Sequence, residues 1–192
     1  MKLSYKMSDA LTKALYKNDK IAPEYVDAYQ YCLEQLFDLI IYHAILLCMG
    51  AILQRFSLTI LYIITLTPTK MLAGGAHAES IEMCSIISFS IFLITLFVCP
   101  LIPLSGPFSI LLFLPTETIL WILAPVCHPN KPLTDSQRKT SRRILLVYFF
   151  LLDIIGVVLI LFNRSVHLHI ILLCLMIVLI NQVLGRILYR NY

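Results

Sequence analysis

The sequence predicts an all-α, polytopic membrane protein with about six membrane segments and an N-terminal amphipathic helix. Of its 192 residues, 59% are hydrophobic, whereas soluble domains are usually about 45–50% apolar. The mean hydropathy is +0.86. Apolar runs long enough to cross a hydrocarbon layer of ~30 Å recur along the chain. Because these runs leave no separate soluble part, we expect one integral-membrane domain over residues 1–192, with membrane segments over about 36–189.

Residues 1–22 are polar and basic, and they lack the apolar core of a cleavable signal peptide. The stretch "LSYKMSDALTKALYK" places Leu3, Met7 and Leu11 on roughly one helical face, with lysines around them. This pattern predicts an amphipathic cytoplasmic helix. Such a helix either lies on an anionic membrane surface or packs on the rest of the protein as an ordinary solvated helix.

The first three membrane segments follow in order. Pro23 suits the first turn of a long helix whose latter part, about Leu36–Leu53, crosses lipid. The second run, "FSLTILYIITLT", has twelve residues and reaches only ~18 Å as a helix, and we expect Pro68 to end it. The third, "IEMCSIISFSIFLITLFV", is followed by "CPLIPLSGP", which must be a loop or a broken helix.

The last three segments are separated by the most polar internal loop, "PVCHPNKPLTDSQRKTSRR". The fourth, "FSILLFLPTETILWILA", contains Pro115 and Glu117. The fifth and sixth are "ILLVYFFLLDIIGVVLILF" and "VHLHIILLCLMIVLINQVLGRIL". Carboxylates are costly in lipid, so Glu117 and Asp153 are expected to face the protein interior or a cavity.

The distribution of basic residues supports six crossings with both ends inside the cell. Thirteen of the fifteen lysine and arginine side chains then belong to inner segments: Lys2, Lys6, Lys13, Lys17, Lys20, Lys70, Lys131, Arg138, Lys139, Arg142, Arg143, Arg186 and Arg190. Only Arg55 and Arg164 fall in outer turns. Four crossings, with segments two or four folded back, stay an alternative.

Several classes of function find no support in the residues. The six cysteines form no CxxC pair and do not resemble a disulfide framework. The net charge of +4 reports on topology, and no basic stripe with interleaved aromatics points to nucleic acid. We expect no cofactor and no metal site.

The stretch "GGAHAESIEMC", Gly74–Cys84, carries the most chemistry. On an uninterrupted helix, His77 and Cys84 would share a face but lie ~10.5 Å apart along the axis, too far for a hydrogen bond. Direct pairing therefore requires a turn, which Gly74 and Gly75 allow because glycine adopts positive φ. The following helix would begin near residues 78–80, with Cys84 about one turn in and its side chain leaning back.

The residues alone leave three interpretations of this stretch. The first is a catalytic pair, since a nearby imidazolium and a helix N-terminus both favour the reactive thiolate. The second is a loop histidine with a packing cysteine. The third, a metal site, would need three or four ligands, and the other histidines show no ligand spacing.

"LAGGAHAESIEMC" resembles the accessory gene regulator B (AgrB) family, whose hallmark is a basic residue, a Gly-Gly-x-His-Ala turn, and a cysteine seven residues after the histidine. Here these are Lys70, Gly74, Gly75, His77 and Cys84. The loop "AP…NKPL…R" is a second match, and "YCLEQL" before the first span is a third. The family's turn often carries arginine where this chain has lysine.

The resemblance implies a membrane cysteine endopeptidase of peptide quorum sensing in Gram-positive bacteria. Its substrate would be a propeptide of the AgrD type. Cys84 would attack the bond before the acidic C-terminal tail, with His77 moving the protons. A thiol or hydroxyl of the substrate would then attack the acyl-thioester and close a thiolactone or lactone ring. The family also implies a homodimer in the lipid bilayer.

Other residues are supporting candidates. The "YCLEQL" match makes Glu34 a residue that orients His77 or the substrate, or else a solvated carboxylate at the mouth of the first span. Lys70 belongs to the turn motif. Three basic residues of the polar loop either attract the acidic tail or serve topology alone: Lys131, Arg138 and Lys139.

Two rival functions come from other classes. A peptide exporter or channel without proteolysis would use Glu117, Asp153 and Asn181 as a polar path. A structural subunit would have its function in a partner. Loss of propeptide cleavage on Cys84→Ser distinguishes both from the peptidase.

Overall fold

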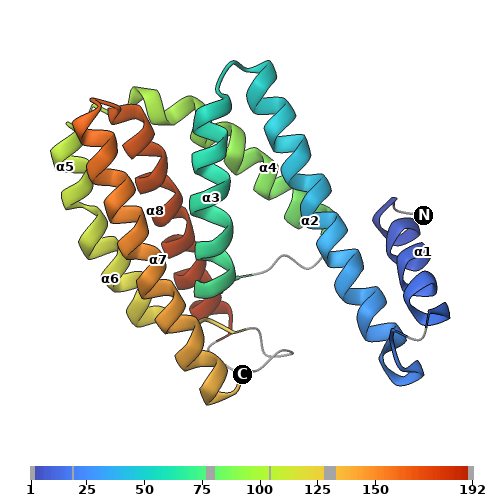
Figure 1. Ribbon diagram of the computed structural model, residues 1–192. Coiled ribbons are helices and arrows are strands. Elements are labelled where there is room, and N and C mark those ends of the chain that lie inside the picture. Colours follow the sequence, from blue (N-terminus) through green and yellow to red (C-terminus); the bar gives the residue numbers. More distant parts are fainter. Residues whose placement is uncertain (1–2, 19, 77–80, 104, 128–132, 190–192) are drawn as a thin grey trace. The chain divides into compact units, whose positions relative to one another are not determined.

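The computed structural model describes residues 1–192 except 1–2, 19, 77–80, 104, 128–132 and 190–192, and it leaves the side chains of 81 and 82 undescribed. Of the described residues, 86% are helical, and these residues form no strand (Figure 1). In this part of the chain six helices are long and apolar enough to cross a membrane. The predicted all-α, multi-pass architecture is thus confirmed.

The chain divides into two compact units, Met1–Gln54 and Arg55–Tyr192. In the first unit a short 3-10 helix, η1 (Pro23–Tyr25), leads into α2 (Val26–Ile52). Pro23 stands at the first helical position, where its missing N–H breaks no hydrogen bond. The single long helix expected from Pro23 onward is confirmed, and it ends before Gln54, whose φ is +55°.

The N-terminal helix α1 (Leu3–Lys17) packs against α2 through small polar side chains rather than its apolar ones. Ser4, Ser8 and Thr12 are buried, whereas Leu3 is 63% exposed and Met7 40% exposed. The small residues let the two helices approach closely, and the apolar face expected from the sequence is left uncovered by α2. That face fits the membrane-surface interpretation of this helix.

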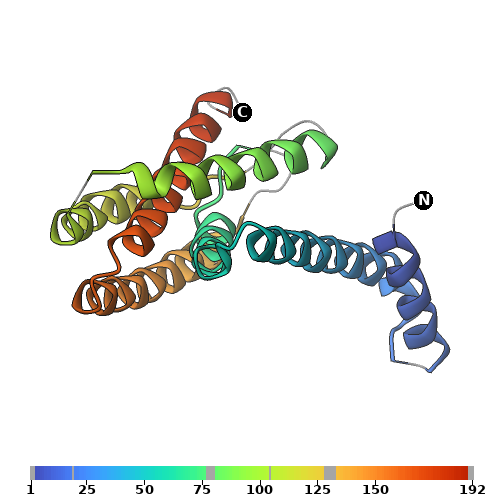
Figure 2. The same ribbon diagram turned by 90° about the horizontal axis from the view of Figure 1, so that it is seen from above.

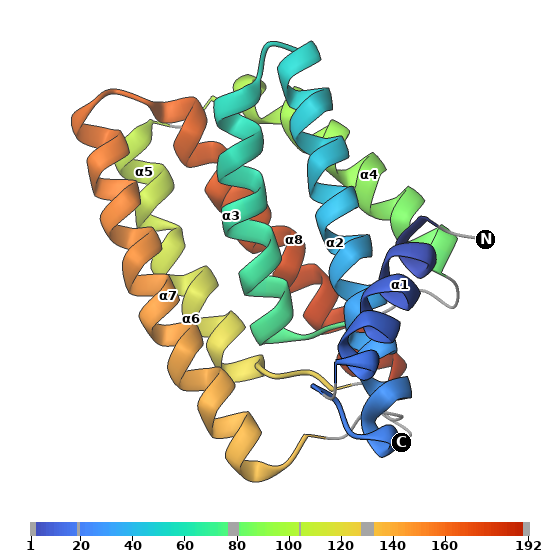
Figure 3. The same cartoon turned by 45° about the vertical axis from the view of Figure 1, so that its right-hand side comes forward.

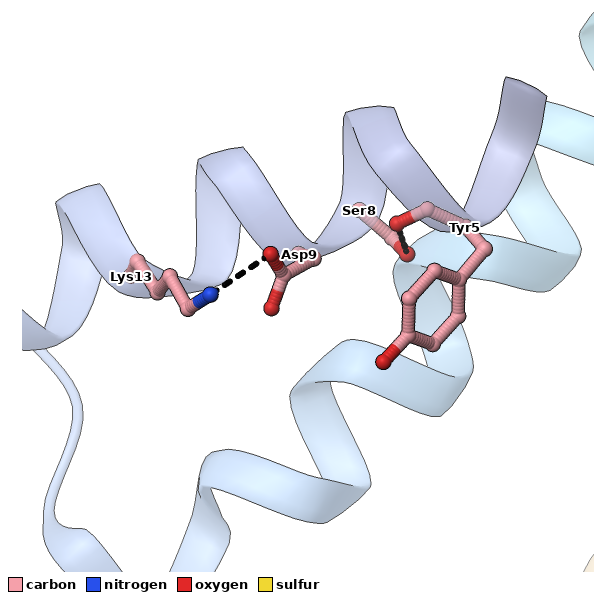
Figure 4. A network of polar contacts seen from close by, with 4 residues as sticks. All are labelled: Tyr5, Ser8, Asp9 and Lys13. Atoms are coloured by element: carbon pink, nitrogen blue, oxygen red, sulfur yellow. Dashed lines mark hydrogen bonds and ion pairs between the residues drawn. The ribbon is translucent and has the colours of Figure 1, made fainter. Parts of the chain in front are cut away.

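The exposed side of α1 carries a local ion pair, drawn in Figure 4. The Lys13 ammonium donates to the Asp9 carboxylate one turn earlier, at 2.7 Å. This hydrogen bond and the attraction between the charges raise the pKa of Lys13. Ser8 Oγ donates to the Tyr5 carbonyl at 3.0 Å. A solvated ion pair such as that of Lys13 and Asp9 contributes little to the stability of a helix.

In the second unit α8 (Ser165–Leu188) is the central helix. It contacts α3 (Phe56–Ala73), α6 (Phe113–Leu123) and α7 (Asp135–Leu161). In Figure 1 it lies between α3 on one side and α7 on the other. In its most apolar window 56% of the residues are buried, the largest share among the six candidate spans.

Helix α4 (Ile81–Val98) crosses α8 obliquely, as Figure 2 shows, and packs on it more sparsely than α3 does. It ends in a 3-10 turn, η2 (Cys99–Leu101), and irregular backbone, which confirms the break expected at "CPLIPLSGP". A buried contact joins this turn to the central helix, because His169 Nδ1 lies 3.1 Å from the Cys99 carbonyl oxygen.

The fourth segment is broken into α5 (Gly106–Leu111) and α6, which follow one another beside α7 in Figure 3. Glu117 on α6 is 5% exposed. It lines a cavity of about 250 Å³ together with Asp153 of α7 and Trp121. The expectation that the two intramembrane carboxyls face a cavity is confirmed.

The prediction that Pro68 ends the second segment is wrong. Helix α3 continues through Pro68 to Ala73, so it has eighteen residues and reaches about 27 Å. Proline has no N–H to donate to the carbonyl four residues earlier, here that of Ile64. The Tyr148 hydroxyl on α7 donates to that Ile64 carbonyl instead. A side chain from a neighbouring helix thus satisfies the freed backbone group, as membrane helices with internal proline require.

We predict that Tyr148→Phe lowers the free energy of unfolding by about 1–3 kcal/mol, because it leaves a backbone carbonyl of a membrane helix unsatisfied. Equilibrium unfolding in detergent micelles measures the loss, with Tyr25→Phe, whose side chain is 55% exposed, as the control. In a Pro68→Ala background the restored N–H should remove most of the cost. An equal cost in both backgrounds would contradict this role of Tyr148.

Candidate active site

The second unit has a sharp turn directly after α3. Gly74 has φ +71° and Gly75 has φ +143°, both in the region that favours glycine. The helix ends at Ala73, and the next helix, α4, begins at Ile81. The turn expected at the two glycines is confirmed, and no continuous helix runs from α3 to Cys84.

Backbone hydrogen bonds attach this turn to the segment that follows α6. Val126 N donates to the Ala73 carbonyl at 2.9 Å, and Gly75 N donates to the Val126 carbonyl at 3.2 Å. A Cβ added to Gly74 would lie 2.0 Å from the Val126 carbonyl oxygen. Only glycine therefore combines this backbone conformation with this close approach.

The turn also lies directly on the central helix. Ala76 N donates to the Asn181 carbonyl at 3.1 Å, and Gln182 Nε2 donates to the Ala73 carbonyl at 2.9 Å. A Cβ on Gly185, one turn further along α8, would lie 2.8 Å from Ala76 N. The small Gly185 lets the turn reach the helix backbone.

Two arginines hold the segment after α6 from the other side. Arg142 Nε donates to the Ala124 carbonyl at 2.6 Å, and Arg186 donates to the Leu123 carbonyl at 2.9 Å. The guanidinium of Arg142 also lies over the Trp121 ring, 5.9 Å from its centroid. Side chains of α7 and α8 thus hold the segment that pairs with the glycine turn.

Cys84 is the fourth residue of α4 and is half-buried. It lines a cavity of about 420 Å³ formed by α3, α4 and α8. Ala76, Lys70, Ser88 and Asn181 line the same cavity, and the other lining side chains are apolar or aromatic. The cavity therefore brings the thiol together with a cation, an amide and the end of the glycine turn.

The other residues singled out from the sequence fall in different places. His77 and Lys131 lie outside the described residues. Glu34 belongs to the first unit and is half-buried on α2. Arg138 and Lys139 are exposed in the first turns of α7, and Arg138 Nε donates to the Leu133 carbonyl at 3.4 Å.

Sequence reasoning missed the part of α8 that carries the turn. Asn181 was considered only for an export path with Glu117 and Asp153, yet the structure places it in a different cavity from those two carboxyls. Gln182 and Gly185 were not singled out. The signal was present in "LINQVLGRIL", where polar and small residues interrupt an apolar run. Within the described part of the chain no group of three His, Cys, Asp or Glu side chains could hold a metal ion.

Comparison with known proteins gives one match that covers nearly the whole chain. The family model described as AgrB, accessory gene regulator B, matches residues 5–184. No curated protein and no solved structure matches the chain. The matched range includes the glycine turn, Cys84, Asn181 and Gln182.

We predict that Gly74→Ala disrupts the site, because a Cβ there meets a carbonyl oxygen at 2.0 Å and positive φ alone costs about 1–2 kcal/mol. In this variant the rate at which a maleimide alkylates Cys84 should differ several-fold from the wild-type rate. The unfolding temperature should fall. The control is Gly106→Ala, whose Cβ meets only side-chain atoms, Leu168 Cδ1 at 3.3 Å and Ile160 Cγ1 at 3.6 Å. Equal behaviour of the two variants would show that the turn tolerates a side chain.

Proposed function

The chain belongs to the accessory gene regulator B family, and from this premise we propose that it is a membrane-embedded cysteine endopeptidase. Membership of the family supports a role in the agr quorum-sensing system. The proposed substrate is a short propeptide of the AgrD type, which the enzyme cleaves before its C-terminal tail and cyclises. Cys84 is the nucleophile and His77 is its base.

The observation that carries this proposal is the shared cavity of Cys84 and Ala76. Ala76 immediately precedes His77 in the chain and is fixed to α8 through its backbone N–H. The turn at Gly74 and Gly75 ends α3 at Ala73, so Ala76 and Cys84 do not belong to one continuous helix. This supports the proposed pair, because a histidine outside the helix can reach a thiol in the helix that follows.

The first chemical step is acyl transfer to the enzyme. His77 takes the thiol proton, and Cys84 Sγ attacks the carbonyl carbon of the scissile bond. A bond forms between sulfur and carbon, and the carbonyl π electrons move onto the oxygen. When they return, the C–N bond breaks, and His77 gives its proton to the leaving amine. The products are a free C-terminal tail and a thioester on Cys84.

The second step closes the ring. A thiol or hydroxyl within the bound peptide gives its proton to His77 and attacks the thioester carbon. The bond to Cys84 Sγ then breaks, and the cysteine recovers a proton from His77. Water would hydrolyse the same thioester, so the site must exclude it. The predominantly apolar lining of the cavity supports this requirement.

The cavity suits a substrate that arrives within the membrane. Ile87 of α4 and Ile180 and Leu184 of α8 line it, yet they are also exposed on the outside of the helices, Ile180 by 58%. In a multi-pass membrane protein such apolar outer side chains face lipid. A membrane-associated peptide can thus enter between α4 and α8 without crossing water.

Charge supports a cytoplasmic location for the site and for both chain ends. Arg142 and Arg186 hold backbone carbonyls near the glycine turn. Arg55 instead binds the Leu96 carbonyl near the opposite end of α4. The positive-inside rule then places the Cys84 end inside.

The proposed roles of the remaining residues follow from charge. Lys70, in the cavity, attracts an anionic part of the substrate. Lys131, Arg138 and Lys139 attract its acidic tail, and Glu34 orients His77 or the substrate. The proposed working form is a homodimer in the cell membrane.

Co-expression with a propeptide tests the proposal. Cys84→Ser and His77→Ala should each abolish tail cleavage and cyclisation, seen by mass spectrometry of the peptide, while membrane insertion stays normal. Cys48→Ser changes an exposed cysteine of α2 and should process normally. Undiminished processing by Cys84→Ser would remove the peptidase and leave an exporter or a structural subunit.

A further inference from the structure

One side-chain amide in the cavity of Cys84 has an N–H donor that makes no hydrogen bond to the described residues. Asn181 Nδ2 is buried and has no hydrogen-bond partner among the described residues. The neighbouring Gln182 differs, because its Nε2 donates to the carbonyls of Ala73 and Leu120. A buried amide donor without a partner lowers the stability of the fold, so a fold built for stability alone would place an apolar side chain at position 181.

The location of this amide is fixed by the turn and by the central helix. A Cβ on Gly75 would lie 2.2 Å from Asn181 Nδ2, so the glycine leaves room for the amide directly over the turn. The Asn181 carbonyl accepts from Ala76 N at 3.1 Å. The backbone carbonyl of Asn181 therefore holds the end of the glycine turn at Ala76, and its side chain lies beside Gly75.

The same side chain lines the cavity with Cys84. The terminal torsion of asparagine is broad, so the amide is free to reorient within the cavity. Other side chains with polar groups also line the cavity, namely Tyr62, Lys70 and Ser88. The Lys70 ammonium ends a flexible stem and suits a charged part of the substrate, whereas Asn181 belongs to the most buried helix and is a short, neutral donor.

We propose that the Asn181 side-chain amide donates a hydrogen bond to the carbonyl oxygen of the scissile bond while Cys84 attacks it. This inference rests on the proposed peptidase function. As the sulfur–carbon bond forms, the π electrons of the carbonyl collect on its oxygen, and the donor stabilises that developing charge. When the C–N bond breaks, these electrons return to the C=O bond of the acyl group. The Asn181 amide transfers no proton and is unchanged.

The donor acts mainly on the rate of acylation and not on binding. Removing one donor of this type lowers kcat by about 10²–10³-fold in enzymes where it has been removed. A merely structural role would instead lower the stability of the protein and alter the access of reagents to Cys84. The two roles are therefore separable by measurement.

The experiment uses the full chain in lipid nanodiscs with a synthetic AgrD-type propeptide. Asn181→Leu removes the donor without adding charge, and Asn181→Asp keeps the shape and removes the donor. Asn163→Asp is the control, because it makes the same chemical change in the distant turn between α7 and α8. Single-turnover cleavage gives the acylation rate, and propeptide affinity is measured in a Cys84→Ala background. Maleimide alkylation of Cys84 and the unfolding temperature report the structure.

The inference requires both Asn181 variants to acylate at least about 10²-fold more slowly. Propeptide affinity, Cys84 alkylation and unfolding temperature should change little, and Asn163→Asp should match the wild type. A wild-type acylation rate in either variant overturns the inference. So does a slow rate that accompanies a lower unfolding temperature or altered alkylation in both variants, since that shows a structural role. If the wild-type protein itself does not cleave the propeptide, the proposed function fails, which is a distinct result.

Discussion

The backbone pairing between the glycine turn and its two neighbours is the constraint on which the site depends. Buried backbone groups need hydrogen-bond partners within the protein, and Ala73 and Gly75 are buried. The turn after α3 and the segment after α6 supply them for each other, through Ala73, Gly75 and Val126. The central helix closes the arrangement by accepting from Ala76. The position of the glycine turn therefore depends on contacts among three elements that are far apart in the sequence.

Much of this could be predicted from the sequence because the signals are local. Hydropathy marks six apolar segments, and Gly74 and Gly75 mark a turn because few other residues adopt positive φ. The proposed site residues His77 and Cys84 follow from the motif. The apolar face of α1 was also visible, because helical periodicity depends only on residue spacing.

What could not be predicted depends on contacts between distant segments. Pro68 stops an isolated helix, yet here Tyr148 of α7 supplies the missing donor to Ile64, and no local pattern shows that. The contact between α1 and α2 is another case, because the two helices pack closely and bury the small residues Ser4, Ser8 and Thr12 rather than larger apolar ones. Likewise, "LINQVLGRIL" shows polar residues in an apolar run, but only the packed structure shows that Asn181 and Gly185 face the turn.

The central claim is that the turn brings residue 77 to within bonding reach of Cys84, and disulfide formation tests it most directly. In a chain with the other five cysteines replaced by serine, His77→Cys should form a disulfide with Cys84 on mild oxidation, since such a bond requires Cα atoms within about 7 Å. Ile91→Cys is the matched control, because it lies seven residues after Cys84 on the continuous helix α4. The account predicts rapid closure of the first pair and none of the second. Failure of the first pair to close, with both thiols open to alkylation, would contradict it.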